Sequence, residues 1–207
     1  MKTFKDLLFE MSPVAMSGDW EEGYENTKTR SKFVIKKNFE LVEKFDKFLE
    51  ENDFYLYKMT NSLYFVFGKH EENGDFYPHM SIDFTRIKTL DKDLNIKKII
   101  KVNGVVSIRK QHGQGIASTV YKYIVNDLGY NILSDDKQYF GARRLWSKLS
   151  DSLDVVVDVV DVDNKKVIEK NVKLKKEDFE GDFDSNYWSK DSSKKNIRFL
   201  LKKVIDK

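Results

Sequence analysis

Cysteine is absent from this sequence of 207 residues, and long apolar runs are absent as well. Without cysteine the chain has no disulfide, no thiol nucleophile and no zinc–thiolate site, which fits a cytoplasmic protein. No apolar stretch approaches the roughly 20 residues of a membrane-spanning helix, and the N-terminus lacks the apolar core of a secretory signal. We therefore expect a soluble intracellular protein with no membrane partner.

A large excess of one charge sign is also missing. The chain has 37 Lys and Arg residues against 34 Asp and Glu residues, a net charge of +3, and the two signs are mixed along it. Such a charge, without a concentrated basic arm, does not indicate a dedicated nucleic-acid-binding protein. Only the pairs Lys97-Lys98 and Lys194-Lys195 favour that alternative, whose signature would be a steep loss of binding with salt.

Hydrophobic residues are plentiful enough for one substantial core. They make up 40% of the chain and include 15 Phe, 10 Tyr and 3 Trp. A chain of this length is short for two independent domains. We expect an N-terminal arm over residues 1–30 and a single domain over residues 31–207 that ends in a hairpin extension. The sequence does not specify an oligomeric state.

Apolar periodicity predicts the elements of that domain. A helical period runs from Ser31 to Glu51. Alternating aromatic and branched residues predict an antiparallel meander of three strands over residues 54–59, 62–68 and 80–87. A strand at 105–108 follows, then a hairpin of residues 153–162 and 165–174 around Asp163-Asn164. Residues 196–204 form a last apolar run, either strand or helix.

A glycine turn between a strand and a helix is the most informative motif. It comprises His112-Gly113-Gln114-Gly115-Ile116-Ala117. Two glycines let the backbone approach a ligand, and the helix start that follows offers unpaired N–H groups and a positive dipole end to an anion. A Walker-type loop is disfavoured because the lysine is missing, and a dinucleotide fingerprint is disfavoured because Ser118 stands at its third glycine.

The elements after the turn continue this pattern. One apolar face marks a helix from Ile116 to Leu128, which Gly129 closes, and a short strand occupies residues 130–133. Ser134 is suited to cap a second helix. The buried stripe of that helix would be Ala142, Leu145, Trp146 and Leu149.

The segment from Val105 to Ala117 resembles the acetyl-CoA-binding motif of the GNAT superfamily of N-acetyltransferases, which has Gln or Arg, two residues, Gly, one residue, then Gly or Ala. The match in organisation runs from about Ser31 to Ser150, and residues 129–149 are similar to divergent members encoded by tailed bacteriophages. The resemblance implies an α/β fold with a mixed, mostly antiparallel central sheet flanked by helices. It also implies acetyl-CoA as co-substrate, held by Ile108, His112, Gly113, Gln114, Gly115, Ile116, Ala117 and Ser118.

The resemblance also suggests catalytic residues, with departures. The family's Asn-x-x-Ala-x-x-x-Tyr pattern begins here at Tyr139 and ends at Trp146, and an indole N–H cannot protonate the departing CoA thiolate. Tyr139 is the nearby phenol that could replace that acid, unless the thiolate leaves to water. A base or water chain near Asp83 or Ser134 would take the proton of the amine.

The expected function is acetyl-CoA-dependent transfer of an acetyl group to an amine of a small molecule or a protein, in the host cytoplasm if the chain is phage-encoded. The alternative is a catalytically inactive phage protein of the same fold that serves as a structural, virion-associated or partner-binding module. Trp146 favours this alternative. So does Leu8-Phe9-Glu10, which is similar to the sites that phage prohead proteases cut.

No metal site is expected. His70 and His79 lie nine residues apart without nearby cysteine. Four aspartates in the hairpin do not follow a calcium-binding loop and suit the solvent side of a strand instead. They are Asp154, Asp158, Asp161 and Asp163.

Overall fold

A computed structural model of the chain describes residues 39–45, 53–70, 72–74, 76–107, 115–135, 140–174, 187 and 196–204. Its strands are β1 (Phe39–Phe45), β2 (Phe54–Met59), β3 (Tyr64–His70), β4 (Phe76–Arg86), β5 (Ile99–Ser107), β6 (Asn131–Leu133), β7 (Val155–Asp161), β8 (Lys166–Glu169) and β9 (Ile197–Lys203). Its helices are α3 (Lys88–Asp93), α4 (Ile116–Asn126) and α5 (Phe140–Ser150). The expected arm over residues 1–30 lies outside the described residues.

The described strands form a mostly antiparallel sheet, so the predicted α/β class is confirmed at this level. The strand order is β1-β2-β3-β4-β5-β6-β9-β7-β8. Strands β5 and β6 run parallel, and every other pair with a described register is antiparallel. No helix in the described part of the chain is long and apolar enough to cross a membrane.

Contacts within the chain divide it into two compact units. Unit 1 comprises Met1–Asp83 and Gly104–Gln114, and unit 2 comprises Phe84–Asn103 and Gly115–Lys207. Strands β4 and β5 each contribute to both units. The single domain expected for residues 31–207 stays a prediction.

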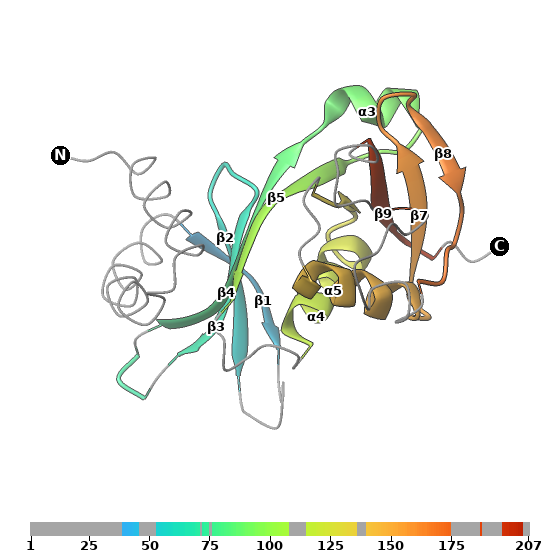
Figure 1. Cartoon of the computed structure of the whole chain (residues 1–207). Coiled ribbons are helices and arrows are strands. Elements are labelled where there is room, and N and C mark those ends of the chain that lie inside the picture. The colour runs from blue at the N-terminus through green and yellow to red at the C-terminus, as the bar shows by residue number, and fades with distance from the viewer. Residues whose placement is uncertain are drawn as a thin grey trace. The chain divides into compact units, whose positions relative to one another are not determined.

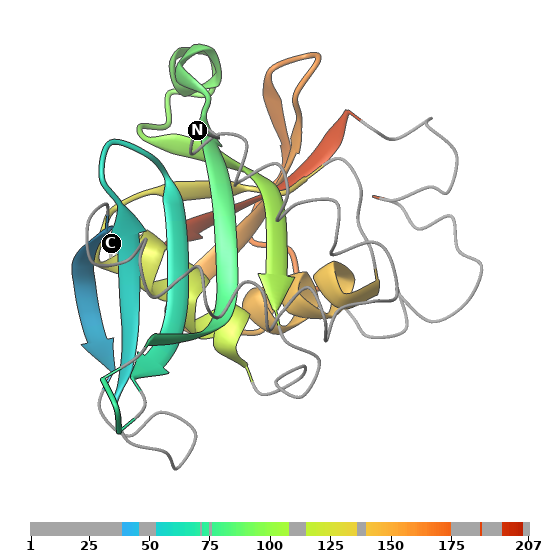
Figure 2. The ribbon, with the colours of Figure 1, turned by 90° about the vertical axis from the view of Figure 1, so that its left-hand side faces the viewer.

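Unit 1 contains the predicted meander, and Figure 2 shows its strands side by side. Phe54 and Phe67 stack with ring centroids 5.1 Å apart, and both side chains are fully buried. The turns between the strands contain residues with a left-handed backbone: Asn61 has a φ of 62° and Gly74 has a φ of 80°. The three predicted strands are therefore present, although β3 is buried at five consecutive positions and does not alternate.

Strand β1 corrects the helix expected over residues 31–51. Residues 39–45 pair antiparallel with β2, with a register shift between Leu41 and Glu43. Phe39 packs edge-on against Tyr64 at 6.2 Å and Phe45 against Phe67 at 5.6 Å. The spacing of apolar residues here fits either period, and pairing with a neighbouring strand overrides the local helical preference. The rest of that expected helix lies outside the described residues.

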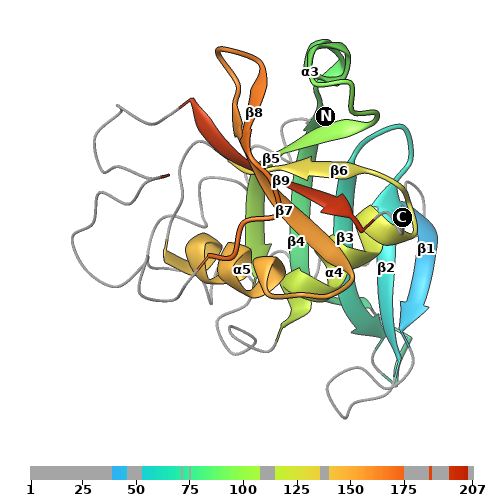
Figure 3. The same ribbon diagram turned by 90° about the vertical axis from the view of Figure 1, so that its right-hand side faces the viewer.

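The sheet of unit 2 has one face that contacts α4 and α5 and another that contacts α3; we call them the α4 face and the α3 face. On the α4 face, Phe199 lies 5.6 Å from Trp146 of α5. Its neighbour Leu200 points to the α3 face, where it packs with Leu90 of α3 and Leu133 of β6. Figure 1 shows α4 beside α5, and Figure 3 shows β9 between β6 and β7.

The C-terminal hairpin is confirmed, but two of its aspartates are not on a solvent side. Asp158 is 1% exposed and pairs with Lys202, and Asp161 is 6% exposed. The Asp161 carboxylate accepts hydrogen bonds from the backbone N–H groups of Asp163 and Asn164 and so closes the turn. Period-2 alternation fails here because both faces of β7 are covered. The last apolar run is the strand β9.

Candidate functional site

The candidate site is the start of α4, where the glycine turn ends. Gly115 is the residue that precedes the helix, and its backbone is left-handed, with φ 87° and ψ 3°. A residue other than glycine is strained in this conformation by about 1–2 kcal/mol, because its Cβ atom approaches the following carbonyl oxygen. The second glycine of the motif is therefore required by the backbone path into α4.

The first turn of α4 keeps its N–H groups free of side-chain caps. No side chain in the described part of the chain caps this end, and its first turn contains no acidic residue. The Ser118 hydroxyl points back and donates to the Gly115 carbonyl at 2.8 Å, and the Thr119 N–H donates to the same oxygen at 3.0 Å. The backbone N–H groups of the first turn and the positive end of the helix dipole thus present a favourable position for an anion.

Lys148 adds a full positive charge at this position. A Cβ atom built on Gly115 would lie 2.9 Å from the Lys148 Nζ, so the ammonium group contacts the turn itself. Lys148 comes from the last turn of α5. A cation beside the positive end of a helix is electrostatically unfavourable, by about 0.3–1 kcal/mol, unless an anion lies between them. The pair of features therefore favours an anionic ligand.

Sequence reasoning missed Lys148. A lysine in the last turn of a helix is common because it interacts favourably with the negative end of the dipole. Nothing in its spacing from the glycine turn, 33 residues earlier in the chain, indicates that the two meet. Only the packing of α5 beside α4 places them together.

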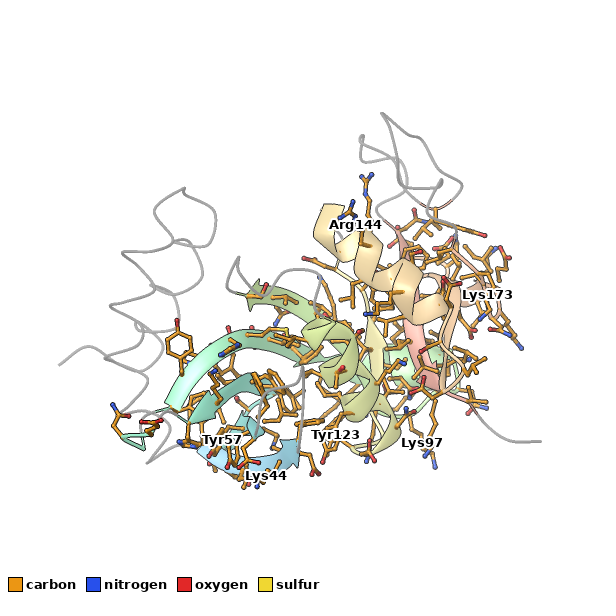
Figure 4. The ribbon with its side chains drawn as sticks, turned by 90° about the horizontal axis from the view of Figure 1, so that it is seen from below. Lys44, Tyr57, Lys97, Tyr123, Arg144 and Lys173 are labelled. Atoms are coloured by element: carbon orange, nitrogen blue, oxygen red, sulfur yellow. The ribbon has the colours of Figure 1, made fainter. Side chains whose placement is uncertain are left out.

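Buried side chains hold α4 and α5 against the sheet. The ring centroid of Tyr121, on α4, lies 6.1 Å from that of Phe84 and 6.3 Å from that of Trp146. Trp146 is 2% exposed, which confirms the core position predicted for it. Burial, followed by the charge of Asp135, raises the pKa of the Tyr121 phenol, so this phenol keeps its proton at neutral pH. Lys173, labelled in Figure 4, donates to the Ser150 carbonyl at the end of α5.

Several predicted site residues lie outside the described part of the chain: Ile108, His112, Gly113, Gln114 and Tyr139. The others are divided between the two units. Gly115, Ile116, Ala117 and Ser118 belong to unit 2 and form the start of α4, with the side chains of Ile116 and Ser118 buried.

Asp83 belongs to unit 1 and is exposed on β4, where its register partner is Tyr64 of β3. Burial, as the largest cause, raises the pKa of the Tyr64 phenol, and the negative charge of Asp83 acts in the same direction. The role as proton acceptor expected for Asp83 stays a prediction.

Ser134 is 1% exposed and fixes the end of β6 to β9. Its hydroxyl donates to the Asp135 carbonyl at 3.3 Å and accepts the Phe199 N–H at 3.1 Å. Asp135, which directly follows Ser134, is not helical, so the prediction that Ser134 caps a helix is wrong. Its hydroxyl is bound to strand backbone instead.

The parallel pairing next to the site is short. It joins Ile99, Ile100 and Lys101 of β5 to Asn131, Ile132 and Leu133 of β6. Strand β6 ends at Leu133, whereas β5 continues to Ser107. Ligands of α/β folds bind beyond the carboxyl ends of parallel strands, and α4 connects these two strands.

The fold and site define an α/β protein in which α4, with Gly115 and Lys148 at its start, connects the parallel strands β5 and β6. Among the described residues no group of three His, Cys, Asp or Glu side chains is placed to hold a metal ion. Comparison with known proteins adds no family: no family model matches the chain, and neither a curated protein nor a solved structure matches it significantly.

Proposed function

We propose that this chain is an acetyl-CoA-dependent N-acetyltransferase of the GNAT type, which transfers an acetyl group to an amine of a small molecule or a protein. One observation carries the proposal. Gly115, in the left-handed conformation, precedes a helix start that no side chain of the described residues caps, and the Lys148 ammonium lies against it. This arrangement suits the pyrophosphate of CoA, and it stands where the motif resemblance expects the pyrophosphate to bind.

Backbone and side chain share the binding in this proposal. The N–H groups of Ile116, Ala117 and Ser118 donate to phosphate oxygens, and Lys148 supplies the compensating charge. A hydrogen bond to a charged group contributes about 1.5–3 kcal/mol. Loss of Lys148 should therefore weaken binding about tenfold or more, since 1.4 kcal/mol corresponds to a factor of ten.

The chemical step is assigned from the sequence. The backbone N–H near Ile108 polarises the thioester carbonyl, Asp83 receives the proton of the amine, and Tyr139 protonates the thiolate. The Ser134 hydroxyl already serves two backbone groups, which favours Asp83 over Ser134 as the proton acceptor. Electrostatic stabilisation by fixed N–H groups is commonly the largest contribution to such a reaction.

A second candidate is a phage protein that keeps the fold and an anion site without catalysis. It is favoured by Trp146, which occupies the position of the family's tyrosine and lies in the core between Tyr121 and Phe199. A core indole supplies no acid for the leaving thiolate. Both candidates would bind CoA, but only the transferase would release its thiol from acetyl-CoA.

Calorimetric titration with acetyl-CoA and with CoA tests the binding step. We expect micromolar binding by the natural chain, loss of binding in Gly115→Glu and a weakening of about tenfold in Lys148→Gln. Lys166→Gln is the matched control because it removes an exposed lysine of β8 far along the chain from α4. Circular dichroism of each variant establishes that it is folded. No binding by the natural chain would refute the transferase proposal.

Turnover separates the two candidates. The natural chain and Tyr139→Phe are assayed for release of free thiol from acetyl-CoA with a panel of amines that includes peptides, polyamines and aminoglycosides. A rate that depends on the amine and falls by about 10²-fold or more in Tyr139→Phe supports the assigned acid. Binding without turnover on any acceptor would favour the inactive module.

A further inference from the structure

Unit 2 also contains a pocket of about 200 Å³ on the α3 face of its sheet. Its walls come from α3, β5, β6, β9 and the turn between β7 and β8. Figure 1 shows α3 next to that turn. The ion pair between Asp93 of α3 and Lys165 of the turn, 3.0 Å long, joins the two across the pocket rim.

Basic side chains from three separate elements line the pocket. They are Lys101 of β5, Lys165 of the β7–β8 turn and Arg198 of β9. Arg198 is only 8% exposed, and one of its guanidinium N–H groups donates to the Ile197 carbonyl at 2.8 Å, which fixes the group at the wall. A cation held in such a poorly solvated position has a stronger field than one on an open surface.

The charge of the lining is positive. It contains three cations and one carboxylate, Asp93, so its net charge is +2. The Thr89 hydroxyl adds a neutral donor. The apolar walls of the pocket are Ile87, Leu90, Leu133 and Val162. Arginine and lysine together suit phosphate oxygens, because the guanidinium donates as a fork and the ammonium acts as a point charge.

We propose that this pocket binds the phosphate group of a small molecule, or inorganic phosphate itself. A phosphate monoester carries a charge of about −1.5 to −2 at pH 7, which matches the lining. The volume accommodates a phosphate with a small substituent, whereas a nucleotide is too large for it.

This site is separate from the start of α4. Leu133 and Lys101 are register partners on β6 and β5, and both lie on the α3 face, opposite the face covered by α4 and α5. The inference therefore does not depend on the proposed acetyltransferase activity. A chain that fails to bind CoA can still bind phosphate here, and the reverse also holds.

A titration of the full chain with inorganic phosphate, monitored by ¹⁵N-resolved NMR, tests the proposal. We expect chemical-shift changes at Thr89, Lys101 and Arg198 that saturate in the millimolar range or below. Lys101→Gln should weaken the binding about tenfold. Lys166→Gln removes a neighbouring exposed lysine that does not line the pocket, and it should leave binding unchanged.

Two further variants keep the test specific. Arg198→Lys preserves the charge but loses the fork, and it should weaken phosphate binding even if Arg198→Gln fails to fold. Lys148→Gln should leave the pocket's titration unchanged, because Lys148 lies at the start of α4. A small phosphate monoester and malonate are titrated in parallel. The first tests whether the phosphate of a small molecule binds as free phosphate does, and the second tests whether a dicarboxylate binds instead.

Three outcomes would overturn the proposal. The first is the absence of saturable shifts at the pocket residues. The second is equal weakening by Lys101→Gln and Lys166→Gln, which would indicate unspecific attraction to surface charge. The third is tighter binding of malonate than of both phosphate probes, which would assign the pocket to dicarboxylates instead.

Discussion

Replacement of Gly68 by alanine should strongly destabilise unit 1, because the position leaves no room for a Cβ atom. A Cβ atom at this position would lie 2.1 Å from the Tyr77 carbonyl oxygen and 2.9 Å from the Pro78 Cα. The first distance is 0.9 Å short of the 3.0 Å that real Cβ atoms keep, and the obstacle is backbone that cannot rotate away. Strand β4 must therefore move away from β3 exactly where their register already shifts.

The cost can be estimated from two contributions. Overpacking of this kind costs about 1–3 kcal/mol, and each ladder hydrogen bond lost costs about 1 kcal/mol more. A total of about 4 kcal/mol would lower the Tm by about 8–16 °C for a chain of this size. The strain is steric, so it should not depend on pH or salt.

Gly104→Ala is the matched control. Gly104 also lies in a strand of unit 1, and a Cβ atom there meets nothing within 4 Å. We expect a change within about 0.5 kcal/mol. Thermal and urea unfolding, each followed by far-UV circular dichroism, measure both variants. If Gly68→Ala melts within about 2 °C of Gly104→Ala, the close approach of the two strands at Gly68 is wrong.

Three further substitutions test the packing of unit 2. Lys202→Met leaves the buried Asp158 carboxylate without its cation and should cost about 2–3 kcal/mol in urea unfolding, whereas Lys203→Met on the adjacent strand position should cost less than 1 kcal/mol. Trp146→Tyr introduces the residue that the GNAT motif has at this position, but it should lower stability by about 2–4 kcal/mol without raising turnover, because the new hydroxyl would be buried. A gain in thiol release would refute this. Hydrogen bonds from the turn hold the pKa of Asp161 at about 2, below its ordinary value of 3.8. The ionised carboxylate therefore stabilises the fold above about pH 4, and this stabilisation is lost as the pH falls to 2. The difference in unfolding free energy between the natural chain and Asp161→Asn should shrink over that interval, and a constant difference would contradict the prediction.

Local patterns predict those elements whose own residues carry the information. The helix α4 follows from its apolar face, but it ends at Asn126 with Asp127 as its C-cap, two residues before the predicted end at Leu128; Gly129, with a φ of 69°, lies just beyond. The hairpin of β7 and β8 follows from alternation around a turn-forming pair of residues. The prediction fails for β1, because the apolar spacing of Phe39–Phe45 fits both a strand and a helix. Only the pairing of this segment with β2 makes it a strand.

The site divides in the same way. A left-handed residue at position 115 and an anion-attracting helix start are local consequences of glycine before a helix, and the sequence therefore determines them. The contact of Lys148 with Gly115 is decided by how α5 packs beside α4, and the pocket on the α3 face by how five elements meet. Backbone conformation depends on a few adjacent residues, whereas the meeting of distant charges depends on the packing of the core between them. For this reason the sequence by itself determined where along the chain a helix start is open to an anion, and only the tertiary structure decided which side chains lie beside that position.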